Sequence, residues 1–110
     1  MITHLETVEQ FEQFVKEGNV VVDFFATWCG PCRMLAPFIE ELSDERQDVK
    51  FAKLDVDKVS EIASKYMIQS IPTLLFFQNG TLVNDVVGFL PKDQLNEKID
   101  KAFSNEIYHL

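Results

Sequence analysis

The stretch VVVDFFATWCGPC, residues 20–32, joins an apolar run to two cysteines. The run from Val20 to Ala26 is apolar at positions that face both sides of a sheet, which is typical of a central strand covered by helices on both sides. Cys29 and Cys32 are the only cysteines of the chain. Because no third or fourth thiol accompanies them, the sequence favours one disulfide that opens and closes over a disulfide framework or a four-thiolate zinc site.

The Cys-x-x-Cys spacing taken alone leaves other interpretations open. Such a pair can also be half of a metal site or two buried apolar thiols. The spacing by itself does not favour redox chemistry over these two alternatives taken together. His4 and His109 are the only histidines, and neither lies at metal-ligand spacing from the cysteines. Nothing in the sequence resembles a flavin or nucleotide site. We therefore predict no metal and no cofactor besides the redox-active disulfide of Cys29 and Cys32.

Length and charge limit the class of protein. The chain has 110 residues, of which 46% are apolar, enough to bury a core without structural disulfides or a metal. No repeat or linker divides it, so we expect a single domain over residues 1–110, with a tail at 104–110 that frays. A formal net charge of -8 argues against binding to nucleic acid or to anionic membranes.

The N-terminal sequence bears on localisation. It does not combine a basic start with an apolar segment and a small-residue cleavage site, and no apolar run approaches the ~18 residues of a membrane span. We therefore expect a soluble, monomeric, cytoplasmic protein, whose two cysteines rest as a dithiol in a reducing compartment. Whether a signal or tether has been removed stays open.

Apolar periodicity and turn residues predict nine elements in the order βαβαβαββα. The first half of the chain contains a strand near Ile2 to Leu5, a helix capped by Thr7 and Gln10 and stopped near Gly18, the strand from Val20 to Ala26, and a long helix from near Pro31. A strand from Phe51 to Val56 and a short helix through Val59 to Tyr66 follow. The last elements are strands from Thr73 to Phe77 and from Leu82 to Val87 around an Asn79-Gly80 hairpin turn, and a helix from Pro91 to Phe103. This order predicts an α/β fold, a mixed central β-sheet sandwiched between helices.

The predicted helix start gives the two cysteines different tasks. A thiol attacks a disulfide only as the thiolate, and the unpaired N–H groups at a helix N-terminus stabilise an anion there. Cys29 falls at that position, so we predict that it is the nucleophile. Cys32 falls one turn inside, is expected to be less exposed, and is predicted to be the resolving thiol. Pro31 withholds an N–H between them, and Gly30 permits close approach of a substrate chain.

Several motifs, in the right order over nearly the whole chain, resemble the thioredoxin family. They are the active-site stretch at 22–32, the next strand at 51–57, the proline loop Ser70-Ile71-Pro72-Thr73, and the hairpin and turn at Asn79-Gly80 and Val87-Gly88. The resemblance implies a thioredoxin fold and a general protein-disulfide reductase that serves electron transport and redox homeostasis. Its implied partners are disulfide-containing proteins and a separate thioredoxin reductase.

The resemblance also implies roles for residues outside the cysteine pair. Asp23 matches the family's buried aspartate, which takes the proton of the second cysteine, here Cys32; from the residues alone a hydrogen-bonded structural Asp is the likelier interpretation. Lys53 matches the lysine close to that aspartate, with a lysine snorkelling at a strand end as an equal alternative. The Ile71-Pro72 bond is expected to be cis, which places Ile71 to pair with an extended substrate.

An apolar docking patch beside the cysteines is the last implied feature. Its expected members are Trp28, Pro31, Ile71, Gly88 and Phe89. Phe25 departs from the family, because many members carry a second tryptophan there, and this change is expected to alter fluorescence more than chemistry.

Other functions use the same surface. A redox-independent binding subunit or chaperone would need the docking patch but not a buried proton acceptor, so Asp23, Pro31 and Pro72 count against it. A reductase dedicated to one enzyme, or an oxidising isomerase, would differ in partner and potential. Pro31 favours a reducing potential, since isomerases of this family usually carry histidine at this position.

Overall fold

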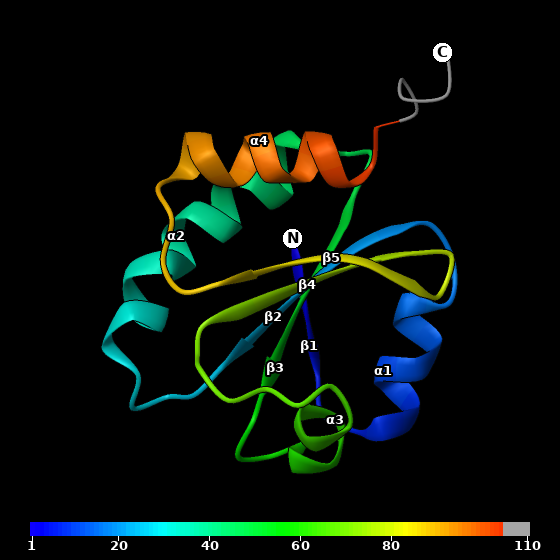
Figure 1. Cartoon of the computed structure of the whole chain (residues 1–110), viewed down its shortest axis with the longest axis vertical. Coiled ribbons are helices and arrows are strands. Elements are labelled where there is room, and N and C mark those ends of the chain that lie inside the picture. Colours follow the sequence, from blue (N-terminus) through cyan, green and yellow to red (C-terminus); the bar gives the residue numbers. More distant parts are fainter. Residues whose placement is uncertain (105–110) are drawn as a thin grey trace.

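A computed structural model describes residues 1–104 and contains the nine predicted elements in the predicted order (Figure 1). The elements are β1 (Ile2–Leu5), α1 (Val8–Val15), β2 (Asn19–Phe25), α2 (Gly30–Glu45), β3 (Lys50–Asp55), α3 (Ser60–Lys65), β4 (Thr73–Gln78), β5 (Thr81–Val87) and α4 (Lys92–Ala102). Most of the tail predicted to fray, residues 105–110, lies outside the described residues.

The strands form one mixed sheet in the order β1-β3-β2-β4-β5. Strands β1, β3 and β2 are parallel, whereas β4 is antiparallel to β2 and to β5. Helices α1 and α3 pack on one face, and α2 and α4 on the other (Figure 1). This arrangement confirms the predicted sandwich and explains the continuous apolar run of β2, because the central strand is buried on both faces.

Turn chemistry holds the outer elements in place. The Thr7 hydroxyl accepts the N–H of Gln10 (3.1 Å) at the start of α1, while the Gln10 side chain accepts the N–H of Glu6 (2.7 Å). In the β4–β5 turn Asn79 and Gly80 have φ of 49° and 87°, the left-handed conformation that a tight hairpin requires. The predicted helix cap and hairpin are therefore both confirmed. Among the described residues, no helix is long and apolar enough to cross a membrane.

Candidate active site

The two cysteines lie where β2 gives way to α2. Cys29 is the N-cap of α2, with extended backbone, and its Sγ accepts the N–H of Cys32 at 3.2 Å. The two residues form a disulfide, with their Cα atoms 5.3 Å apart. Pro31 stands in the first turn of the helix, where a missing N–H costs little. A sulfur at this position therefore lies at the positive end of the helix dipole.

Both cysteines are almost fully buried in the disulfide form. Cys29 is 4% exposed and Cys32 is 3% exposed, so the two cysteines hardly differ in exposure in this state. In the disulfide, the Cys29 sulfur is bonded to that of Cys32 and lies 3.8 Å from the Ile71 carbonyl oxygen. Phe25 and Ile71 pack against the pair.

Asp23 occupies the middle of β2 and is fully buried. Neither carboxyl oxygen has a hydrogen-bond partner among the described residues, so the structure does not support a hydrogen-bonded structural Asp. Burial raises the pKa of Asp23 to about 7, and the nearby Lys53 charge opposes that rise. Neutral and ionised carboxyl groups are therefore both accessible near neutral pH.

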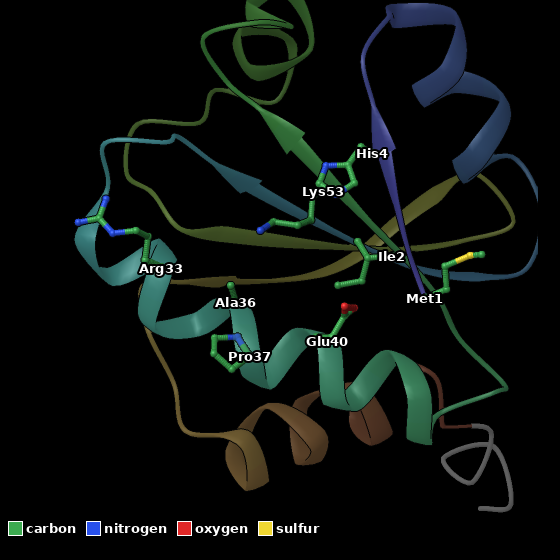
Figure 2. Close-up of a pocket in the computed structure, with 8 residues that line it drawn as sticks. All are labelled: Met1, Ile2, His4, Arg33, Ala36, Pro37, Glu40 and Lys53. Carbon is green, nitrogen blue, oxygen red and sulfur yellow. The ribbon is translucent and has the colours of Figure 1, made fainter.

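Lys53 lies beside Asp23 on the neighbouring strand β3, in direct register. It is half-buried, and its Nζ lies 4.4 Å from the centre of the Phe25 ring. It also lines an open groove of about 670 Å³ between the sheet and α2 (Figure 2). The side chain therefore both neighbours the buried carboxyl group and reaches toward solvent, which combines the two interpretations of the sequence.

The proline loop lies against the cysteines. The Ile71-Pro72 peptide bond is cis, as the resemblance implied, and the Pro72 carbonyl accepts the N–H of Gly88 at 2.8 Å. Gly88 has a φ of 94°, which a side chain would strain. The structure thus brings Ile71, Pro72 and the turn after β5 together next to Cys29.

Trp28 and Phe89 are exposed, as a docking surface requires. Trp28 is 68% exposed, and its indole N–H donates to the Asp57 carboxylate at 2.9 Å. Phe89 is 36% exposed, and its ring centre lies 5.8 Å from that of Phe38 on α2. Sequence reasoning missed Asp57 and Phe38 as neighbours of the site. Neither contact has a local signal, because each joins segments far apart in the chain.

Known proteins match this chain over most of its length. The thioredoxin family model matches residues 2–101 of the chain. The chain belongs to the thioredoxin family. Thioredoxin from Mycoplasmoides gallisepticum is 44% identical over 95 residues, which cover 86% of this chain and 95% of that protein. Thioredoxin from Bacillus subtilis is 48% identical over 96 residues, 86% of this chain and 92% of that protein.

Solved structures agree with the sequence relatives. The structure of Plasmodium falciparum thioredoxin superposes with a TM-score of 0.86 at 38% identity, covering 91% of this chain and 98% of that one. These matches confirm the thioredoxin fold. With the cysteine pair at the start of α2, they make the chain a thiol-disulfide oxidoreductase of a family that works through its own disulfide.

Proposed function

We propose that this thioredoxin is a general protein-disulfide reductase in which Cys29 attacks the substrate and Cys32 resolves the mixed disulfide. The observation that carries the proposal is the contact between the Cys32 N–H and the Cys29 sulfur at the N-terminus of α2. In the dithiol form the same N–H would stabilise a Cys29 thiolate, whereas Cys32 lies inside the first turn.

The reaction takes two displacement steps. The Cys29 thiolate attacks one sulfur of a substrate disulfide, forming a mixed disulfide and releasing the other substrate sulfur as a thiolate. Cys32 then loses its proton and attacks the Cys29 sulfur, which forms the Cys29–Cys32 disulfide and expels the second substrate sulfur. Two electrons pass from the dithiol to the substrate, and a separate thioredoxin reductase returns them.

Asp23 is the proposed acceptor of the Cys32 proton. Its carboxyl group is buried without a hydrogen-bond partner among the described residues, and a pKa of about 7 suits proton exchange at neutral pH. Lys53 is proposed to favour the carboxylate form, because its charge opposes the effect of burial. The two residues would together set the pH at which resolution becomes fast.

Substrates are proposed to dock on the surface around the disulfide. The Ile71 backbone would pair with an extended substrate chain, Gly30 would allow its close approach, and apolar contacts would add affinity without reading one sequence. The proposed apolar contacts are Trp28, Pro31, Ile71, Pro72, Gly88 and Phe89. Such a surface suits many disulfide-containing proteins.

The setting of the protein is proposed from the same features. A dithiol that must be re-reduced works best in the reducing cytoplasm, where it would serve electron transport as a monomer. The net charge of -8 does not favour nucleic acid or anionic membranes as partners. The comparisons lend no support to a redox-independent binding subunit or chaperone.

Cysteine variants test the assigned roles. We would measure dithiol-driven reduction of a protein disulfide by wild type, Cys29→Ser and Cys32→Ser. Cys29→Ser is expected to lose activity because the nucleophile is gone, and Cys32→Ser is expected to accumulate mixed disulfides because nothing resolves them. Full activity of Cys29→Ser, or mixed disulfides trapped on Cys32 of that variant, would reverse the assignment.

A further inference from the structure

Phe25 and Asp23 lie on the same face of β2, two residues apart. In the neighbouring strand β3, Lys53 is in register with Asp23, and Asp55 is in register with Phe25. The aromatic ring, the lysine and the buried carboxyl group therefore share one patch of the sheet beneath α2. From its sequence, Phe25 is expected to affect fluorescence only, and this arrangement indicates a second effect.

The Lys53 ammonium group lies over the Phe25 ring. Its Nζ is 4.4 Å from the ring centre, within the range of about 6 Å in which a cation is attracted to an aromatic face. Phe25 also packs against the cluster of Ala26, Cys29 and Cys32, which supports the ring. A ring held by this packing restricts where the flexible lysine can place its charge.

We propose that Phe25 is a positioning residue whose ring holds the Lys53 ammonium group beside the Asp23 carboxyl group. The proposal rests on the proposed function, because it concerns the proton acceptor assigned there. Phe25 packs against the cysteines but carries no group that forms a bond or moves a proton, and its proposed effect on Asp23 passes through Lys53.

Lys53 lines an open groove that gives its ammonium group access to water. Figure 2 shows Lys53 projecting into the groove in a direction away from Glu40, whose carboxyl group reaches from α2 toward Ile2, while Arg33 points away. The charged and titratable groups around Lys53 are His4 of β1, Asp23 of β2, Asp55 of β3, Arg33 and Glu40 of α2, and the N-terminal ammonium group of Met1. Without the aromatic ring, the ammonium group would lose this contact and would be freer to move from Asp23 into the water of the open groove.

Loss of the Phe25 ring is expected to change the pKa of Asp23 in one direction. The Lys53 charge opposes the effect of burial on the pKa of Asp23, so moving that charge away raises this pKa further. At a given acidic pH, fewer molecules then carry the Asp23 carboxylate that accepts the Cys32 proton. The acid limb of the resolution rate therefore moves to higher pH by the same interval.

The first test follows the titration of Asp23 by carboxyl-carbon NMR in the oxidised protein. Phe25→Leu is expected to raise the Asp23 pKa by about 0.3 to 1 unit, and Phe25→Trp, which keeps an aromatic face, is expected to stay within about 0.2 unit of wild type. Phe14→Leu is the matched control. It removes a similar contact, with the Lys50 Nζ 4.8 Å from the ring centre, and Phe14 shares no patch with Asp23.

A double-mutant cycle shows whether the effect passes through Lys53. Lys53→Met alone is expected to raise the Asp23 pKa more than Phe25→Leu does, and in the Lys53→Met background Phe25→Leu is expected to have no further effect. An equal shift in both backgrounds would overturn the proposal. So would a Phe25→Leu shift no larger than that of Phe14→Leu.

Kinetics separates this proposal from the assignment of Asp23. Resolution of the mixed disulfide by Phe25→Leu is expected to be about two- to tenfold slower than in wild type at about pH 6 and equal at about pH 9. The Asp23→Asn variant tests the acceptor role on its own. If Asp23→Asn resolves the mixed disulfide as fast as wild type, while Phe25→Leu shifts the Asp23 pKa as expected, the acceptor role is wrong and Phe25 still positions Lys53.

Discussion

Asp23 couples reactivity to stability in a single side chain. Its position in an apolar strand predicts burial, which the structure confirms, and this burial raises the pKa of Asp23 to about 7. The lack of any hydrogen-bond partner among the described residues could not be predicted, because it depends on which side chains of β3, β4 and α2 face the carboxyl group. A proton acceptor of this kind is ionised only at a cost to the folded state.

This cost makes a prediction for Asp23→Asn. The folded-state pKa of Asp23 is raised, so its stabilising effect is full below the unfolded pKa and is lost as pH rises through about 7. Between about pH 5 and about pH 8, oxidised wild type should lose about 2–3 kcal/mol of unfolding free energy relative to the variant. Urea unfolding of both proteins at the two pH values measures it, and a constant difference would contradict the raised pKa.

The junction of β2 and α2 shows what local patterns predict. The apolar run, the cysteine spacing and Pro31 predicted a strand followed directly by a helix, with Cys29 at its start, because these signals act over a few residues. The bond from Trp28 to Asp57 and the contact of Lys53 with Phe25 were not predicted. Both depend on how β3 lies alongside β2, and strand register has no signature within either strand alone.

The β4–β5 hairpin illustrates a second local signal with a distant consequence. Asn79-Gly80 predicted the turn, but the Asn79 side chain also accepts the N–H of Gly18 at 2.8 Å, and the Asn79 N–H donates to the Gly18 carbonyl at 3.0 Å. These two bonds join the hairpin to the loop between α1 and β2. The side chain that fits the left-handed turn therefore also connects two elements that are distant in sequence.

Substituting Asn79 separates these two roles. Asn79→Ala is expected to lower the unfolding free energy by about 1–2 kcal/mol, because it leaves the Gly18 N–H without its acceptor and strains a left-handed residue. Asn79→Asp keeps an acceptor oxygen and should lose less than half as much unfolding free energy as Asn79→Ala. Asn79→Gly removes the acceptor but relieves the strain of the left-handed backbone. Urea unfolding ranks the three variants, and equal losses for Ala and Asp would show that the bond to Gly18 contributes nothing.

The molecule owes its rigidity to two apolar layers, one on each face of the sheet. The ion pairs of Lys92 with Glu41 and Glu45, which join α4 to α2, lie on the surface, where such pairs contribute little. The surface charge therefore contributes little to the stability of the fold. A formal net charge of -8 is expected to change the rate at which charged partners approach the protein.

Salt should change the rate of reduction in opposite directions for substrates of opposite charge. The protein attracts a cationic partner over roughly a Debye length, about 10 Å at 0.1 M salt, and repels an anionic one. Raising salt from about 20 mM to about 300 mM should slow reduction of a basic protein disulfide about threefold or more and speed that of an acidic one. Trp28 is the only tryptophan and lies beside the cysteines, so stopped-flow fluorescence can follow both reactions. A common salt effect on the two substrates would mean that docking ignores the net charge and depends on the apolar contacts alone.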